Sequence, residues 1–348
     1  MAPDSCFIEG DADTIIDHLS QLPEERKKYR IIITSPPYYK HRRYGDDHRE
    51  IGREISDYIF VERLFGLFSK CRSLLRDDGS LWIVIGDSRR SYGKLLIPHR
   101  LTARLVKAGY TLREDIIWYK RNYITSGSNI NFSQAYEYVL FFSKYGNCFT
   151  NMDGIRTKGN EAKEGRNKEP PHNMLQFGPI QPDKKKIVRI SKKIANWNAT
   201  ATTENLPTTS EIARAYGYDP EKFCPTCYRK FKRHATRNRI GEHKHYPIFA
   251  ACNSKGKNPG NVWDIATKAH HGSEHFAIFP EELVERIVKF ATQKGDWVLD
   301  PFSGRGTTGI ICKRLERRFT GIDLYPFNVA LSRKNMQDAS TYHSASTL

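Results

Sequence analysis

Residues 31–39, Ile-Ile-Ile-Thr-Ser-Pro-Pro-Tyr-Tyr, combine groups that could bind a ligand. The three isoleucines predict a short buried strand, and the two prolines remove backbone donors and end it. A stiff turn follows, with a hydroxyl, free carbonyl groups and two aromatic rings. In an open α/β sheet, ligands bind at this carboxyl edge of the strands. A proline-rich turn after a core strand, without a ligand, is the simpler alternative.

A second group of residues lies near the end of the chain. A strand at 297–300 leads into Pro-Phe-Ser-Gly-Arg-Gly-Thr-Thr-Gly, then a helix at 310–315 and a strand at 318–323 that ends in Asp323. This order is typical of a Rossmann-type unit that holds an adenosine-containing ligand, with the acid on the ribose hydroxyls. Gly304, Gly306 and Gly309 also have the spacing of a dinucleotide site, so a nicotinamide cofactor stays open. Asp300 would repel a pyrophosphate but suits the cationic amino-acid group of S-adenosylmethionine.

The elements between these motifs alternate in type. Apolar spacing predicts helices and strands in turn, which favours a largely parallel sheet with crossover helices. Asp77-Asp78-Gly79 is expected to end one helix, and Pro280 to begin another. The predicted strands are 6–11, 80–87, 110–119 and 134–143, and the predicted helices are 15–19, 59–75, 95–108 and the stretch after 280.

Charge is distributed unevenly along the chain. The net charge is +17, and residues 151–260 hold 22 Lys or Arg against 10 Asp or Glu. A concentrated basic segment predicts a polyanionic partner, although a merely solvated basic surface is the alternative. We expect one domain from 1–150 and 261–338, a basic insert at 151–260, and a flexible tail at 339–348. No apolar run is long enough to span a membrane, which predicts a soluble cytoplasmic protein.

The insert carries a candidate metal site. Cys224-Pro225-Thr226-Cys227 has the spacing of a zinc knuckle, and His243, His245 and Cys252 could complete a tetrahedron. The alternative is two free thiols in a turn. The surrounding residues are basic and could contact nucleic acid: Arg229, Lys230, Lys232, Arg233, Arg237 and Arg239.

The two motifs together resemble those of the DNA amino-methyltransferases. Thr34-Ser35-Pro36-Pro37-Tyr38 is similar to their catalytic motif, and residues 300–309 to their cofactor loop. The catalytic motif precedes the cofactor loop, as in the circularly permuted β class. The resemblance implies a Rossmann-like class I methyltransferase sheet, of α/β class, with helices on both faces. The basic segment at 151–260 then corresponds to the target-recognition insert.

The resemblance also implies roles for individual residues. Ser35 and the Pro36 carbonyl would hold the two protons of an exocyclic amino group, and Tyr38 would stack on a flipped base beside Pro37. S-adenosylmethionine would be the methyl donor. The implied cofactor residues are Asp11, Phe279, Asp300, Pro301, Phe302, Ser303, Gly304, Gly306, Thr307, Thr308 and Asp323.

The serine at position 35 bears on the target base. In this family, Ser before Pro-Pro-Tyr usually accompanies methylation of cytosine N4, whereas Asp or Asn accompanies adenine N6. We therefore expect a site-specific cytosine-N4 methyltransferase of duplex DNA. Adenine N6 methylation and an inactive DNA-binding protein on the same scaffold are the alternatives. A cognate restriction endonuclease would be its partner, and the sequence leaves monomer and homodimer open.

Overall fold

An eight-stranded sheet organises the residues that the computed structural model describes, which are 5–22, 29–41, 43–91, 93–123, 125, 130–157, 258–267 and 279–344. In spatial order its strands are β1 (Ser5–Glu9), β10 (Arg318–Asp323), β9 (Trp297–Asp300), β2 (Tyr29–Thr34), β3 (Leu75–Ile85), β7 (Tyr136–Ser143), β6 (Thr111–Tyr119) and β8 (Val262–Asp264). All neighbours pair in parallel except β3 with β7 and β7 with β6. The largely parallel α/β sheet is confirmed, with β7 as its reversed strand.

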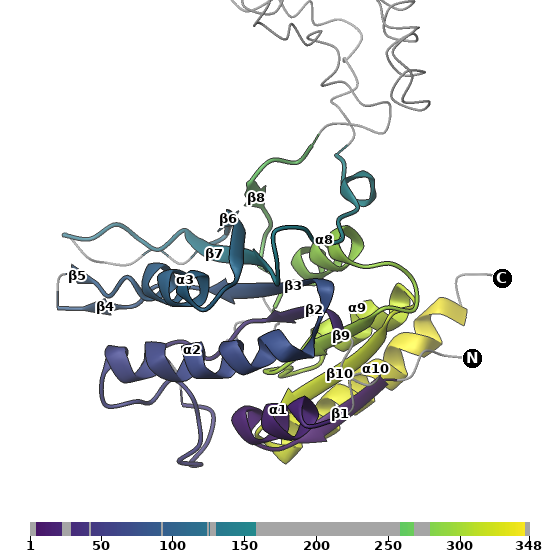
Figure 1. Ribbon diagram of the computed structural model, residues 1–348, viewed down its shortest axis with the longest axis horizontal. Coiled ribbons are helices and arrows are strands. Elements are labelled where there is room, and N and C mark those ends of the chain that lie inside the picture. Colours follow the sequence, from purple (N-terminus) through teal and green to yellow (C-terminus); the bar gives the residue numbers. More distant parts are fainter. Residues whose placement is uncertain are drawn as a thin grey trace, which may run out of the picture. The chain divides into compact units, whose positions relative to one another are not determined.

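Helices cover both faces of this sheet (Figure 1). One face carries α1 (Ala12–Ser20), α2 (Asp57–Leu74) and α3 (Ile97–Lys107), and the other carries α8 (Glu281–Ala291), α9 (Thr307–Arg314) and α10 (Pro326–Ser344). Successive strand side chains point to opposite faces. Ile32 therefore packs in the first layer, and Ile31 and Ile33 pack in the second. A strand buried on both sides explains the continuous isoleucine run.

Three local differences from the expected elements have physical causes. β3 begins at Leu75, directly after α2, so Asp77-Asp78-Gly79 lies inside the strand. Tyr29 pairs with Leu75 but Ile31 pairs with Ser80, so residues 76–79 form an irregularity in the ladder. Helix α10 was not predicted, because its apolar residues form no pronounced stripe. It includes 339–344, which were expected to belong to a flexible tail.

Two smaller elements flank the sheet, the first after the carboxyl end of β3 and the second near its amino end, where the Phe149 N–H donates to the Asp78 carbonyl. A two-stranded hairpin of β4 (Arg89–Arg90) and β5 (Gly93–Lys94) follows β3, and a short 3-10 helix spans Met152–Gly154. Both were absent from the sequence prediction. The hairpin was missed because two-residue strands carry no periodicity that a sequence could display.

The chain divides into two compact units. One comprises residues 1–155 and 259–348, and the other comprises residues 156–258. The first contains every strand of the sheet described above. Across the residues that the structure describes, no helix is both long enough and apolar enough to cross a membrane.

Candidate active site

The proline turn and the glycine loop leave the same edge of the sheet from adjacent strands. β2 and β9 pair in parallel, with Ile32 opposite Leu299. The turn that begins at Ser35 and the loop that begins at Pro301 therefore start side by side, although most of the chain separates them. The order of strands reverses direction here, with β10 and β1 on one side and β3 on the other. Such a switch point is where open α/β sheets bind ligands.

A buried carboxylate joins the two motifs. The Asp300 side chain accepts hydrogen bonds of 2.6 Å from the hydroxyl of Thr34 and 2.6 Å from that of Thr308. The backbone N–H of Phe302 donates a third bond, of 3.1 Å. Burial raises the pKa of Asp300 to about 6, and the three hydrogen bonds oppose that rise. Both of its oxygens are engaged within the protein, so the expected direct contact with a cationic donor remains a prediction.

The glycine loop offers an open surface at one glycine and tight packing at the others. A Cβ on Gly304, whose φ is +51°, would meet nothing within 4 Å. A Cβ on Gly306 would lie 2.9 Å from Ser332, and one on Gly309 would lie 2.7 Å from Met336. Only Gly304 therefore leaves room for a ligand, whereas the other two glycines let α9 pack against its neighbours.

Ser303 is the polar side chain of this loop that lacks a partner. Its hydroxyl oxygen is buried and has no hydrogen bond among the described residues. Buried polar groups are nearly always satisfied, so an orphaned hydroxyl beside open space suits a ligand. Of the other loop candidates, Phe302 and Thr307 are half-buried, whereas Pro301 and Thr308 are buried.

Two acids close the opposite side of the loop. Asp323, at the end of β10, accepts hydrogen bonds from the N–H groups of Gly304 and Tyr325 and from the Asn328 amide. A carboxylate has about four acceptor sites, so about one remains for a ribose hydroxyl. Burial raises the pKa of Asp323. Asp11 caps α1 through the Thr14 N–H, and the neighbouring Gly10 N–H donates to the Asp323 carbonyl.

Phe279 makes a different set of contacts from these loop residues. It is half-buried and packs against the apolar cluster under α8. The structure thus brings Asp300, Ser303, Gly304 and Asp323 together at the glycine loop. A contact between Phe279 and the cofactor remains a prediction.

The catalytic turn presents Ser35 and Tyr38 at the sheet edge. Ser35 and Tyr38 are half-buried and Pro36 is buried. The Tyr38 hydroxyl donates a 2.5 Å hydrogen bond to Glu137 Oε2, and the Lys120 ammonium pairs with the other carboxylate oxygen. Desolvation and the Glu137 carboxylate raise the pKa of Tyr38 well above its ordinary value.

Sequence inspection did not identify Glu137 and Lys120 as site residues. They reach the site because β7 is antiparallel, which places its first residues at the carboxyl edge where β6 ends. Glu137 is only 7% exposed. One signal was available in the sequence: an acid within Tyr-Glu-Tyr-Val-Leu-Phe-Phe must find a partner if that strand is buried.

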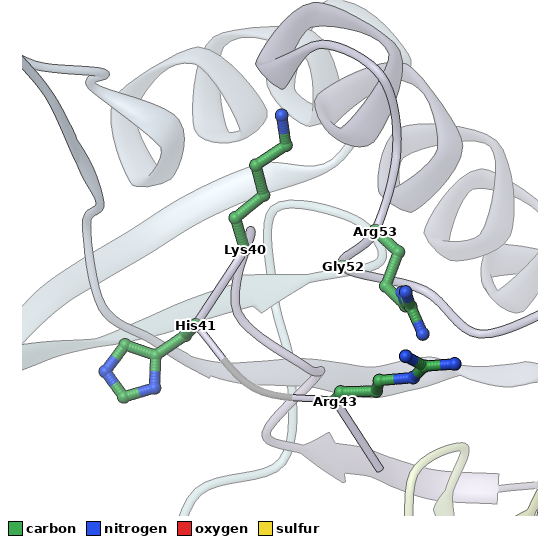
Figure 2. Close-up of a pocket in the computed structure, with 5 residues that line it drawn as sticks. All are labelled: Lys40, His41, Arg43, Gly52 and Arg53. Atoms are coloured by element: carbon green, nitrogen blue, oxygen red, sulfur yellow. The ribbon is translucent and has the colours of Figure 1, made fainter. Parts of the chain in front are cut away.

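A basic pocket opens next to the catalytic turn. It measures about 350 Å³ and is lined by Lys40, His41, Arg43, Gly52 and Arg53. Figure 2 shows the guanidinium groups of Arg43 and Arg53 lying side by side, whereas Lys40 and His41 point in other directions. The Lys40 N–H donates to the Gly52 carbonyl at 2.7 Å, which holds the two arms of the loop together. The rings of His41 and Tyr38 meet edge to face, 6.1 Å apart.

A buried acid anchors this loop to the cofactor side of the sheet. Glu50 is 4% exposed and accepts hydrogen bonds from the N–H groups of Tyr44 and Gly45. The Tyr325 hydroxyl donates a further bond to it, of 2.6 Å. Tyr325 follows Asp323 by two residues, so the loop touches both halves of the candidate site.

The predicted metal and nucleic-acid residues lie outside the described residues. These are Cys224, Cys227, His243, His245 and Cys252, and the basic residues from Arg229 to Arg239. Within the described part of the chain, no three His, Cys, Asp or Glu side chains form a group that could hold a metal ion. Both sets therefore remain predictions of the sequence.

Known proteins resemble this chain along nearly its whole length. Methyltransferase M.Cfr9I from Citrobacter freundii is 26% identical, and the match covers 96% of this chain and 88% of that protein. M.SmaI from Serratia marcescens is 24% identical, with 95% and 91% covered. Both relatives are named as Type II methyltransferases. The solved PvuII DNA methyltransferase, described as cytosine-N4-specific, superposes with a TM-score of 0.55 at 15% identity, covering 97% of this chain and 92% of that one.

The fold of that structure is the class I methyltransferase fold, and the sheet described here shares it. The sequence model of the N6/N4 DNA methylase family matches residues 29–334. This range begins with the strand that carries the catalytic turn and ends beyond the glycine loop and Asp323. Since the match spans most of the chain and includes both motifs that meet at the sheet edge, the chain belongs to the DNA methylase family.

Proposed function

We propose that the protein transfers a methyl group from S-adenosylmethionine to the N4 amino group of a flipped-out cytosine in duplex DNA. The pairing of β2 with β9 carries this proposal. It brings an acceptor-rich turn and a glycine loop to one edge, where Asp300 ties them together. A methyl acceptor and a methyl donor must meet in this way for direct transfer.

The residues present fit the proposed cofactor. The open face of Gly304, the unpartnered Ser303 hydroxyl and the remaining acceptor of Asp323 suit a ligand with ribose hydroxyls and a charged amino acid. Helix α9 begins at Thr307 without a side-chain cap, so its first N–H groups could receive a carboxylate. When bound, S-adenosylmethionine supplies an electrophilic methyl group, which the amino nitrogen takes while the C–S bond breaks and a proton leaves to solvent.

The chain's own groups prepare the amino nitrogen. Its lone pair is delocalised into the base, and acceptors on its two protons favour a tetrahedral nitrogen. The Ser35 hydroxyl and the Pro36 carbonyl are the acceptors at the end of β2. The Tyr38 ring offers a face on which the extruded base can stack. Positioning supplies the rate enhancement, and no covalent intermediate with the enzyme is formed.

The choice of cytosine rests on Ser35, because Ser before Pro-Pro-Tyr usually accompanies N4 methylation in this family. The basic segment 151–260 is proposed to contact phosphates and to read the target sequence. A zinc ion bound by Cys224 and Cys227 is proposed to stabilise the fold of this segment. The Type II relatives support a place in restriction and modification, with a restriction endonuclease of the same specificity as partner.

Product analysis tests the proposal directly. Unmethylated duplex DNA is incubated with the protein and labelled S-adenosylmethionine, digested to nucleosides and analysed by mass. We expect N4-methylcytosine. N6-methyladenine would overturn the choice of base but keep the reaction class, whereas DNA that gains no methyl group would overturn the class.

Ser35→Ala probes the assigned acceptor. We expect turnover to fall by about 100-fold, as for loss of a preorganised hydrogen-bonding group, with cofactor affinity unchanged. Turnover and cofactor binding are measured in parallel, with Ser73→Ala on the exposed face of α2 as the control. Wild-type turnover in Ser35→Ala would remove this hydroxyl from the mechanism.

A further inference from the structure

The hydroxyl of Tyr38 is bound to a largely buried ion pair. It donates to Glu137 Oε2 at 2.5 Å, and the Lys120 ammonium pairs with Glu137 Oε1. The Glu137 side chain is 9% exposed and that of Lys120 is 20% exposed. A carboxylate paired with an ammonium offers only acceptors. The single phenol proton of Tyr38 is therefore directed to Glu137.

The ion pair is itself held in place. The Lys120 ammonium lies over the Trp118 ring, 5.1 Å from its centroid, and the Lys120 N–H donates to the Ala135 carbonyl at 2.8 Å. Trp118 is 4% exposed and lies opposite Glu137 in the pairing of β6 with β7. The carboxylate that receives the Tyr38 proton therefore has a fixed position in the sheet.

The Tyr38 ring is also restrained away from its hydroxyl. A Cβ on Gly86 would lie 3.1 Å from Tyr38 Cε2 and 3.5 Å from Cδ2, so the backbone at the end of β3 lies close to that side of the ring. Pro36 and Pro37 restrict the backbone that leads to the ring. The hydrogen bond to Glu137 adds a restraint at the far end of the side chain.

Stability alone does not require an ion pair at this place. Removing two charges from water is costly, and apolar residues of similar size often stabilise a protein interior at least as well. An apolar pair could not, however, accept the Tyr38 proton. The charged pair thus supplies an acceptor at the edge of the sheet where the proposed target base would stack.

We propose that Glu137, held by Lys120, is a positioning residue that fixes the orientation of the Tyr38 ring on which the target base stacks. The inference rests on the proposed function and extends it to an ion pair outside both motifs. Tyr38 then acts through its ring and not through its hydroxyl. Fixing the ring matters because a small displacement of the base from the methyl donor slows direct transfer.

Two substitutions at residue 137 separate the acceptor from the charge. Glu137→Gln and Glu137→Leu both remove the carboxylate that pairs with Lys120, but only Gln keeps an oxygen that can accept from Tyr38. We expect single-turnover methyl transfer to slow by about 10-fold in Glu137→Leu, equivalent to one hydrogen bond, and by less than about 3-fold in Glu137→Gln. In a Tyr38→Phe background the two variants should agree within about 2-fold, because no phenol proton remains to be accepted.

Tyr110→Phe is the matched control. Tyr110 is a buried phenol whose hydroxyl donates to the Phe68 carbonyl at 2.9 Å. Its loss should lower the stability measured by urea unfolding and leave the transfer rate unchanged. Affinity for S-adenosylmethionine is measured for every variant and should stay within about 2-fold of wild type, since the substitutions act on the base and not on the cofactor.

Each other outcome overturns a stated role. If Glu137→Leu transfers methyl groups as fast as the wild type, Glu137 has no positioning role. If Glu137→Gln is as slow as Glu137→Leu, the acceptor for the Tyr38 proton is not what matters. If Glu137→Leu remains slower than Glu137→Gln in the Tyr38→Phe background, Glu137 does not act through Tyr38. If the wild type itself transfers no methyl group to DNA, the proposed function fails first, and the positioning role fails with it.

Discussion

Asp300 is an acid placed where water cannot reach it, at 2% exposure, with its two oxygens accepting from Thr34, Thr308 and Phe302. A buried carboxylate without such partners would be strongly destabilising. Here the hydrogen bonds to Asp300 join the strand that ends in the catalytic turn to the helix that follows the glycine loop. The residue that the sequence assigned to the cofactor also holds the two motifs in register.

The raised pKa of Asp300 predicts a pH-dependent stability. Its pKa is about 6 in the folded protein against 3.8 as the reference value, so the native state binds this proton more tightly. Ionisation of Asp300 therefore costs stability as pH rises from about 4 to about 6, by about 3 kcal/mol in total. Asp300→Asn removes this titration with little change of shape.

The measurement is the unfolding free energy in urea across that pH range. Because Asn does not titrate, the stability of Asp300→Asn relative to wild type should increase between about pH 4 and pH 6.5. Asp115→Asn, at an exposed site on β6, should show no such trend. A constant difference across the range would mean that Asp300 titrates normally.

At the scale of elements, the end of β3 sets how closely Tyr38 can approach the sheet. A Cβ on Gly86 would lie 3.1 Å from Tyr38 Cε2 and 3.5 Å from Glu137 Cγ. The phenol ring is tied to Glu137 at its far end, so it cannot move away without weakening that hydrogen bond. This position of Tyr38 therefore requires glycine at residue 86, although that residue follows another strand, β3.

Gly86→Ala should slow methyl transfer several-fold and cost about 1 kcal/mol of stability, as overpacking does. Gly66→Ala is the control: it lies inside α2, and its Cβ would meet nothing within 4 Å. That substitution should stabilise the protein by about 0.5–1 kcal/mol without changing the rate. Methyl-transfer rates and urea unfolding are measured for both. A Gly86→Ala enzyme with the wild-type rate would show that Tyr38 tolerates displacement.

The loop between β2 and α2 directly follows the catalytic turn and carries exposed positive charge. Arg43 and Arg53 lie side by side in its pocket, and both donate to the Gly45 carbonyl. Adjacent like charges favour an anion, and the proposed substrate brings phosphates close to Tyr38. Arg43 also pairs with Asp46, and Arg49, on the same loop, donates two hydrogen bonds to Asp47. Among the described residues, Arg53 is thus the arginine of this pocket whose charge no acid neutralises.

Arg53→Gln should therefore weaken DNA binding and reduce the slope of log affinity against log salt by about 0.9, the value for one phosphate contact. Arg49→Gln should change the slope by less than half as much. Both are measured by DNA titration at several salt concentrations. Equal slopes for Arg53→Gln and wild type would place the phosphates elsewhere.

At the scale of the whole molecule, the sheet and most of the net charge lie in different parts of the sequence. Residues 1–155 and 259–348 form the unit that carries the sheet and its edge. Residues 151–260 carry a net charge of +12, against +5 for the rest of the chain. A segment so rich in Lys and Arg has few apolar residues with which to build a core, and a metal ion can supply the missing folding energy.

We therefore expect about one zinc ion per purified chain, held through Cys224 and Cys227. Cys224→Ser should lose most of this metal, whereas Cys148→Ser, in the described unit, should retain it. Metal content is measured by elemental analysis after dialysis. Equal zinc in all three proteins would reject the Cys-x-x-Cys pair as ligands.

The sequence alone determined where the two motifs lie and which elements carry them. Local patterns sufficed for the isoleucine strand and its Pro-Pro-Tyr turn, for the glycine loop and for Asp323, because strand, turn and helix signals lie within a few residues of one another. The family resemblance followed from the order of those motifs. The α/β class followed from the alternation of elements.

Only the tertiary structure decided what surrounds them. Strand order placed β2 against β9, and the reversal of β7 brought Glu137 and Lys120 to Tyr38 from a distant part of the chain. Sheet pairing and side-chain hydrogen bonds between remote residues leave no local periodicity. For the same reason, the sequence could not predict that Asp300 lies between Thr34 and Thr308, although all three residues belong to the two motifs that it identified.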